Sequence, residues 1–193
     1  MSFDAAYRIP SAAPWDIGEP QPEIVRLADA GLIGGSVIDI GCGTGENALF
    51  MATRGHDVLG VDSAPSAIAL AQAKAVERGS SATFIEADVL DLSQLPRRFD
   101  TAIDVGCFHV FGDADRTPYV ASVRGVVRTG GRLHLLCFSD AQPGQYGPRR
   151  VSAREIRDSF EADWEIEEIR AVRFATLMGP EGAQAWLATM RRV

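Results

Sequence analysis

The stretch VIDIGCGTGEN, from Val37 to Asn47, decides the fold of this chain. Branched apolar residues around a single acid are typical of a buried parallel strand. Glycines follow at alternate positions, 41, 43 and 45. Such glycines allow a tight turn and let the backbone approach a ligand closely, while N–H groups at the start of a following helix favour an anionic group. We therefore expect this loop to hold a nucleotide-like ligand.

Strand-like and helix-like segments alternate along the rest of the chain. This alternation predicts a doubly wound parallel sheet with helices on both faces, and ligands in such sheets lie at the carboxyl ends of the strands. The segment 183–193 has helix propensity, and a closing antiparallel strand is the alternative. The expected strands are 36–40, 57–62, 82–88, 99–106, 131–139 and 164–172; the expected helices run from Pro22 to near Gly31, 45–54, 64–79 with Ser63 as N-cap, 115–128 with Asp115 as cap, and 152–160.

Length and composition indicate one globular domain over residues 1–193, with an irregular arm at 1–18. The net charge of −7 argues against nucleic acid as a partner, because an acidic surface repels phosphates. No apolar run approaches the ~20 residues of a membrane span, and the N-terminus lacks a secretory apolar region. The three cysteines form no CxxC pair, so we expect buried free thiols in a cytoplasmic protein.

Two further acids end the second and third expected strands. Asp62 lies 21 residues after Gly41, where an acid accepts from both hydroxyls of a ribose. Asp88, one strand further out, is placed to accept from an exocyclic amine such as that of adenine. The dinucleotide fingerprint GxGxxG would need glycine where this chain has Glu46, and a carboxylate beside a pyrophosphate would be repelled. The sequence therefore argues against NAD or FAD.

The segments VIDIGCGTG (37–45), GVD (60–62) and EADV (86–89) resemble the first three motifs of the class I S-adenosylmethionine-dependent methyltransferases. The resemblance implies a seven-stranded sheet of order 3-2-1-4-5-7-6, with strand 7 antiparallel. Strand 7 would then lie near the C-terminus, after a hairpin loop GPEG at 179–182. The cofactor would be S-adenosylmethionine, and its product S-adenosylhomocysteine.

The resemblance also implies residue roles. Asp39 and the glycine loop would hold the methionine end, Asp62 the ribose, residues 87–89 the adenine, and residues 105–108 the sulfonium region. Cys42 would have a packing role only. The implied cofactor-binding residues are Trp15, Asp39, Gly41, Cys42, Gly43, Gly45, Asp62, Ser63, Ala87, Asp88, Val89, Val105, Gly106 and Cys107.

Two longer segments resemble a narrower group. YRIPSAAPWDIGEPQP (7–22) and DVGCFHVFGDADR (104–116) are similar to small-molecule methyltransferases related to the thiopurine, tellurite-resistance and heterocyclic-toxin enzymes. There the N-terminal arm folds over the cofactor as a lid. This implies that Trp15 covers the cofactor and that Tyr7 faces the methyl group. A hydrophobic staple of the first helix is the alternative role for Trp15.

Methyl transfer needs alignment and exclusion of water, whereas a base is needed mainly for hydroxyl acceptors. His109, just past the fourth strand, is the candidate base, and a structural histidine is the alternative. Tyr7 is a second catalytic candidate, and Phe108 and Tyr146 are candidate acceptor-binding residues. Asp104, His109, Asp113 and Asp115 have no spacing that sets a metal geometry, so we expect no metal.

The segment DVGCFHV stands where amino methyltransferases of adenine bases carry an Asn/Asp-Pro-Pro-Tyr motif. With the acidic charge, this points to a small, largely apolar acceptor methylated at O, S or N. An NAD(P)-dependent reductase on a related sheet is one alternative. A cofactor-binding module without catalysis is another, because no indispensable catalytic residue is visible. The acceptor's identity and the oligomeric state stay open.

Overall fold

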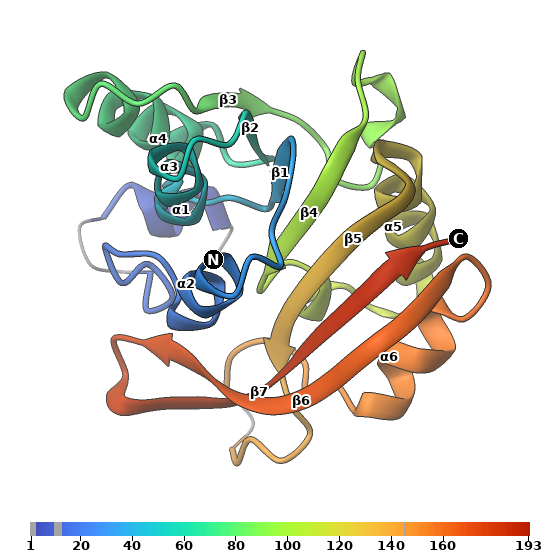
Figure 1. Cartoon of the computed structure of the whole chain (residues 1–193). Helices are drawn as coiled ribbons and strands as arrows, with labels where there is room; N and C mark the ends of the chain where they lie inside the picture. Colours follow the sequence, from blue (N-terminus) through green and yellow to red (C-terminus); the bar gives the residue numbers. More distant parts are fainter. Residues whose placement is uncertain (1–2, 10–12, 145) are drawn as a thin grey trace.

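A computed structural model describes residues 3–9, 13–144 and 146–193 of the chain (Figure 1). Seven strands form one sheet in the order β3-β2-β1-β4-β5-β7-β6, and β7 is antiparallel to both of its neighbours. This confirms the fold class, including the strand assignment of the C-terminal segment against its helix propensity. The strands are β1 (Val37–Ile40), β2 (Val58–Asp62), β3 (Thr83–Glu86), β4 (Phe99–Val105), β5 (Val127–Phe138), β6 (Trp164–Thr176) and β7 (Gly179–Arg192).

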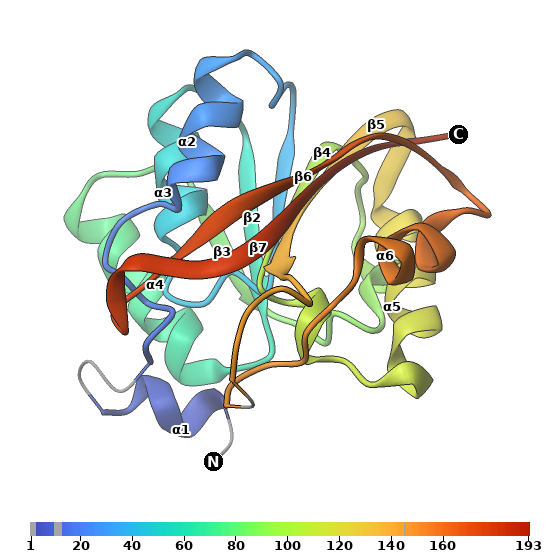
Figure 2. The same ribbon diagram turned by 90° about the horizontal axis from the view of Figure 1, so that it is seen from below.

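Helices cover both faces of the sheet, as Figure 2 shows. On one face α2, α3 and α4 pack with residues such as Ile24, Leu49 and Ile68, and on the other α5 and α6 pack with Tyr119 and Phe160. The core is therefore split into two apolar layers by the sheet. The helices are α1 (Phe3–Tyr7), α2 (Pro22–Asp29), α3 (Glu46–Thr53), α4 (Pro65–Glu77), α5 (Asp113–Val126) and α6 (Ala153–Phe160), with 3₁₀ turns η1 (Leu92–Gln94) and η2 (Phe108–Val110).

Several boundaries differ from the sequence-based predictions. Helix α5 begins at Asp113 after an extended Gly112, so Asp115 is not its cap. The hairpin turn is Leu177–Met178, and GPEG belongs to β7, because Thr176 already pairs with Gly179. Helix α6 begins at Ala153 rather than Ser152, because Ser152 is its N-cap and forms a complete capping box with Glu155.

The N-terminal arm also differs from the irregular segment that was expected. Residues 3–7 form the short helix α1, which packs against α4. Ser63 does not cap α4 through its side chain, since Ala64 is the N-cap residue. Instead the Asp4 carboxylate accepts the Ser66 N–H at 2.8 Å, so the arm itself satisfies a free donor at the start of α4.

Candidate active site

The glycine loop follows β1 as predicted, and three separate elements pack against it. Gly41, Gly43 and Gly45 all have positive φ, at 68°, 53° and 85°. A Cβ on Gly41 would lie 2.8 Å from Cys107, and one on Gly45 would lie 2.7 Å from Phe84. A Cβ on Gly43 would lie 2.9 Å from the Tyr7 hydroxyl of α1. Any side chain would therefore be strained by its backbone and would collide with β3, α1 or the segment after β4. The loop needs glycine for both reasons.

Asp62, at the end of β2, holds this loop in place. Its Oδ2 accepts the Gly43 N–H at 2.8 Å, and its Oδ1 accepts the Ala64 N–H at 2.9 Å. The carboxylate thus ties the glycine loop to the start of α4. Burial raises the pKa of Asp62, although the two N–H groups partly offset that effect. Each oxygen keeps a second lone pair that a hydroxyl could use.

The residues expected at the adenine side lie together beyond Asp62. Ser63, Glu86, Ala87 and Asp88 line an open hollow at the ends of β2 and β3. Asp88 is exposed, and its Oδ1 accepts the Leu90 N–H at 2.9 Å, while Val89 is buried and does not line the hollow. The hollow can therefore offer the second oxygen of Asp88 and the small side chain of Ala87 to a planar base.

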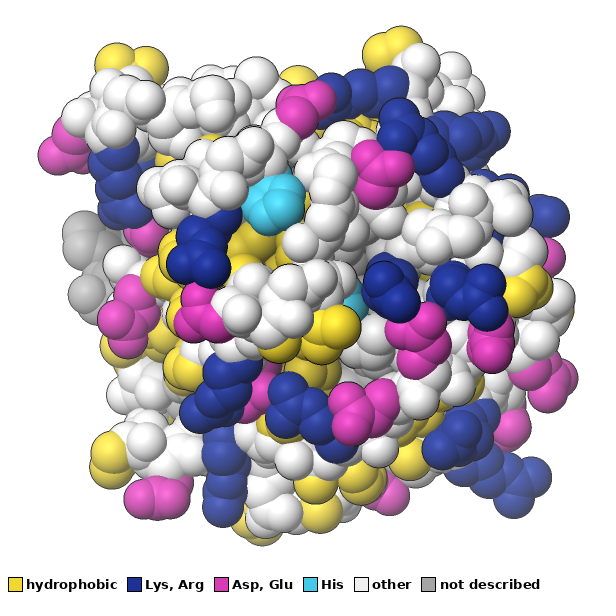
Figure 3. All heavy atoms as spheres, in the orientation of Figure 1, with side chains coloured by type: hydrophobic (Ala, Val, Ile, Leu, Met, Phe, Trp, Pro, Cys, Tyr) yellow, Lys and Arg dark blue, Asp and Glu magenta, His cyan; other side chains and the backbone are white. Residues whose placement is uncertain are grey.

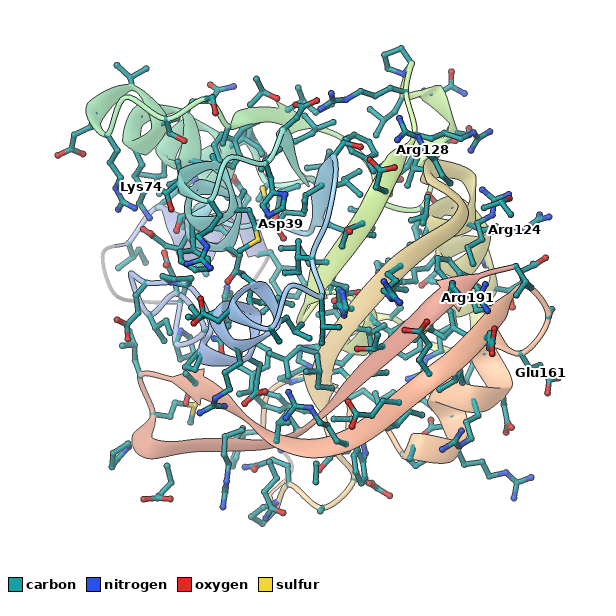
Figure 4. All side chains as sticks on the ribbon, viewed as in Figure 1. Asp39, Lys74, Arg124, Arg128, Glu161 and Arg191 are labelled. Atoms are coloured by element: carbon teal, nitrogen blue, oxygen red, sulfur yellow. The ribbon has the colours of Figure 1, made fainter. Side chains whose placement is uncertain are left out.

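Asp39, inside β1, carries the most unusual carboxylate of the site. Figure 4 shows it in the interior beside β1. It is 1% exposed, and neither oxygen accepts a hydrogen bond from any residue that the structure describes. Burial raises its pKa to about 8, and the nearby acids Asp104 and Asp62 add to the rise, while the Ala48 N–H opposes it. An unpaired buried carboxylate fits a cationic group, such as the ammonium of a methionine moiety.

The segment after β4 is fixed by Asp104, which sequence reasoning had considered only as a metal ligand. Asp104 is fully buried and accepts the Cys107 N–H at 2.8 Å, the Phe108 N–H at 2.9 Å and the Tyr119 hydroxyl. Burial raises its pKa to about 6. These bonds fix the turn after β4 that brings Cys107 against Gly41 of the glycine loop. That residues 105–107 border the sulfonium stays a prediction. The acid near the end of β4, in the segment Asp-Val-Gly-Cys, was the available signal.

His109 lies in this segment, but its geometry does not suit a general base. Its Nδ1 accepts the Phe138 N–H at 2.9 Å, so the proton of the neutral ring is on Nε2. Burial, reinforced by the charge of Arg150, lowers its pKa to about 3. The only basic lone pair is thus committed to the backbone of β5. This supports the structural-histidine alternative.

The two expected acceptor-binding residues are not at the site. Phe108 is fully buried between Tyr119 and Phe160, because η2 turns its ring into the layer below α5 and α6. Tyr146 is 92% exposed, and its carbonyl oxygen accepts from Arg150. We therefore retain neither residue as a pocket wall.

Aromatic rings that sequence reasoning missed gather where the acceptor side was expected. His109 stacks on Phe174 with centroids 6.1 Å apart, and Phe138 meets both rings edge-on. A Cβ on Gly106 would lie 3.2 Å from Phe174. The cluster therefore stands directly beside the end of β4. Phe174 comes from β6, so no local signal linked it to the site.

The arm reaches the glycine loop through Tyr7 and Asp16. The Tyr7 hydroxyl lies 2.9 Å from where a Cβ of Gly43 would be, and it accepts the Trp15 indole N–H at 2.9 Å. Both carboxylate oxygens of Asp16 lie 3.0 Å from the Thr44 hydroxyl. The structure thus brings Tyr7 to the cofactor loop. Asp16 and Thr44 had not been predicted.

Glu46 does not act as the sequence argument supposed. It is buried and pairs with Lys74 at 2.7 Å and Arg78 at 2.7 Å, both on α4 (Figure 4 labels Lys74). These pairs keep its pKa low although burial opposes them. Its charge is neutralised inside the protein, so it is not an argument against a pyrophosphate. Lys74 also donates to Thr44 at 2.7 Å, linking α4 to the loop.

The strand order and the glycine loop are those of a doubly wound, nucleotide-binding methyltransferase. Comparisons with known proteins identify the family. A family model described as "Methyltransferase domain" matches residues 37–131. A 2-heptyl-1-hydroxyquinolin-4(1H)-one methyltransferase from Mycobacteroides abscessus is 37% identical over 180 residues, which cover 89% of this chain and 79% of that protein. The chain therefore belongs to the class I S-adenosylmethionine-dependent methyltransferases, and it acts on small molecules.

Solved structures agree with this assignment. One, described for the conversion of a disulfide bond into a thioacetal group during echinomycin biosynthesis, is 38% identical with a TM-score of 0.87, covering 98% of this chain and 91% of that one. Magnesium protoporphyrin IX methyltransferase from Synechocystis, with bound S-adenosylhomocysteine, is 21% identical with a TM-score of 0.70, covering 89% of this chain and 80% of that one. The second likeness concerns the fold alone.

The described residues contain neither a cluster of metal ligands nor a helix that could span a membrane. Within residues 3–9, 13–144 and 146–193, no His, Cys, Asp and Glu side chains group in threes or more as a metal site would need. In the same ranges, no helix has the length and apolar character needed to cross a membrane.

Proposed function

We propose that this chain transfers the methyl group of S-adenosylmethionine to O, S or N of a flat, largely apolar acceptor that ionises without help from a protein base. The observation that carries the proposal is the state of His109: its Nδ1 lone pair is bound to the Phe138 N–H, and its pKa is lowered to about 3. His109 therefore cannot act as the general base for an acceptor whose proton must be removed by the protein.

The cofactor half supports this proposal through its charges. When bound, S-adenosylmethionine supplies an electrophilic methyl group on a positively charged sulfur. Asp39 provides an unpaired buried carboxylate for a cationic group, Asp62 provides lone pairs for ribose hydroxyls, and the hollow at Ala87 and Asp88 provides room for a base. Val105 to Cys107 would border the reacting sulfur. Electrostatic attraction here orients the cofactor rather than moving a proton.

The acceptor half supports a flat partner. Phe174 and the neutral His109 ring are buried beside Gly106 and pack against Phe138, which is partly exposed. The accessible part of the Phe138 ring favours a planar acceptor through stacking, and the buried rings behind it help to exclude water from the reacting atoms. The relatives are compatible with an acceptor that needs no protein base. One is named for a hydroxyquinolinone, whose N-hydroxyl is a weakly acidic oxygen, and another is described for the conversion of a disulfide, whose sulfur atoms carry no proton to remove.

The proposal also covers the N-terminal arm, the binding partners and the cellular compartment of this protein. Residues 1–18 would act as a lid, of which residues 1–2 and 10–12 lie outside the described residues. Contacts of Tyr7, Trp15 and Asp16 at or near the glycine loop support this role. A nucleic-acid partner is disfavoured because acidic and basic side chains are interspersed on the face in Figure 3, with pairs such as Arg132–Glu167 at 2.9 Å. Free, buried cysteines at 42, 107 and 137 suit a reducing cytoplasm.

Two experiments test the proposal against its alternatives. Calorimetric titration with S-adenosylhomocysteine should give heat, and NADH should give none; the reverse result would favour a reductase. Labelled S-adenosylmethionine should transfer its methyl group onto members of a panel of phenols, thiols and N-hydroxy heterocycles. We expect the more acidic member of each matched pair to react faster. Cofactor binding without transfer to any class would favour a module without catalysis.

A further inference from the structure

Trp15 is held from three sides in the arm. The preceding Pro14 carbonyl accepts the Leu177 N–H of the β6–β7 turn at 2.8 Å. The following Asp16 accepts from Thr44 of the glycine loop at 3.0 Å. The Phe3 ring of α1 meets the indole edge-on with centroids 5.8 Å apart. Its backbone and ring therefore have little freedom, and the indole N–H has a defined direction.

That N–H donates to Tyr7 Oη at 2.9 Å, and the two rings meet edge-on. An indole nitrogen can only donate, so the phenol oxygen must accept, and the proton of Tyr7 has to point elsewhere. Within the part of the chain that the structure describes, no acceptor for this proton is found. The arrangement leaves a hydroxyl donor with a fixed oxygen and an unused proton.

The unused proton lies at the cofactor loop. The Tyr7 oxygen is 2.9 Å from the position that a Cβ of Gly43 would take. Burial raises the pKa of Tyr7, and the charges of Asp62 and Asp16 raise it further, so the phenol keeps its proton at any physiological pH. A neutral O–H donor beside a glycine loop is placed to donate to an acceptor atom of a ligand bound at that loop.

We propose that Trp15 is a positioning residue for the cofactor: by donating to Tyr7 Oη, it directs the tyrosine proton toward an acceptor atom of S-adenosylmethionine lying on Gly43. This inference rests on the proposed function, because it needs the cofactor at that loop. This role differs from merely covering the cofactor, because the indole N–H, and not the contact surface of the ring, would strengthen cofactor binding.

Calorimetric titration with S-adenosylhomocysteine of four proteins tests the inference: wild type, Trp15→Phe, Tyr7→Phe and the double variant. Phenylalanine keeps an aromatic ring in each place and removes one polar group. Each single variant should bind about 3- to 10-fold more weakly, the range for one lost hydrogen bond. The double variant should have the same affinity as the single variant that binds more weakly, because the two single substitutions remove the same interaction. Thermal unfolding should show that all four are folded.

Phe3→Leu is the matched control, because Phe3 touches the indole but takes no part in the hydrogen bond. Its affinity should stay within about twofold of wild type. Multiplying effects in the double variant would overturn the inference and indicate that Trp15 merely anchors the arm, as would unchanged binding in Trp15→Phe. Tighter binding in Tyr7→Phe would also overturn it, because Tyr7 would then occupy the ligand's place. No binding by wild type would instead remove the proposed function.

Discussion

The two halves of the site solve different problems. At the ends of β1 and β2, Asp39 and Asp62 supply carboxyl groups: Asp62 accepts from the backbone N–H groups of Gly43 and Ala64, and Asp39 has no hydrogen-bond partner among the described residues. At the ends of β4 and β5, the ring of His109 is neutral and packed among phenylalanines. The first half binds through charge and backbone, and the second offers shape. Because the cofactor carries the reactive group, the enzyme needs only to bind the cofactor in one half of the site and to position the acceptor in the other.

The arm contacts the glycine loop and the β6–β7 turn, and removal of this proposed lid should have the largest effect. Deletion of residues 1–18 should lower methyl transfer by at least about a hundredfold, because cofactor alignment and exclusion of water would both depend on closure. The sheet should stay folded, since the buried apolar residues of the described arm, Ala6 and Ala13, belong to neither core layer and Trp15 packs only partly buried against one of them. Activity and thermal unfolding measured together check this.

Hydrogen exchange gives an independent view of the arm. Exchange over residues 1–18 should slow when S-adenosylhomocysteine is added. If exchange is equally slow without ligand, the contacts of Asp4 and Asp16 make the arm a permanent part of the fold, and the proposed lid does not open.

Asp62→Ala should sharpen the description of the cofactor half. It removes the acceptor of the Gly43 N–H as well as the expected ribose contacts, so S-adenosylhomocysteine should bind more weakly by about 1.5–3 kcal/mol. Calorimetry measures the loss. Asp88→Ala is the control: this exposed residue should lose less, about 1 kcal/mol or below. Equal affinity of wild type and a folded Asp62→Ala protein would break the charge-and-backbone account.

His109→Asn tests the acceptor half through stability. The pKa of His109 is about 3 in the folded protein, below the ordinary 6.5 of an unfolded chain. The unfolded chain therefore binds an extra proton as pH falls below about 6.5, and stability decreases. Between pH 7 and pH 5 wild type should lose up to about 2 kcal/mol more than the variant, whose amide oxygen can still accept the Phe138 N–H. Denaturant unfolding at both pH values measures this, and equal losses would mean that His109 is charged in the fold.

The contrast between the halves also explains what the sequence could predict. The glycine loop and Asp62 lie at or next to the ends of β1 and β2. The local sequence pattern could therefore predict where they lie and suggest which ligand they bind. The strand order and the C-terminal strand followed from the same motifs. Asp39 was predicted as well, although its lack of a partner was visible only in the structure.

Roles set by distant contacts could not be predicted in this way. His109 is neutral because of the Phe138 N–H on β5, and Glu46 is neutralised by Lys74 and Arg78 on α4. Phe108 is buried by helices that follow it in the chain. Nothing in the sequence near these residues encodes those partners, and residue type alone suggested a base, a repelling acid and a pocket wall.

The pH dependence of kcat/KM for two acceptors on the same ring, which differ only in a substituent that changes the acidity of the nucleophile, tests the central claim most directly. If the acceptor ionises without a protein base, the inflection of the profile should move with the pKa of the acceptor. An inflection at the same pH for both acceptors would assign the proton transfer to a group of the protein and would contradict the account.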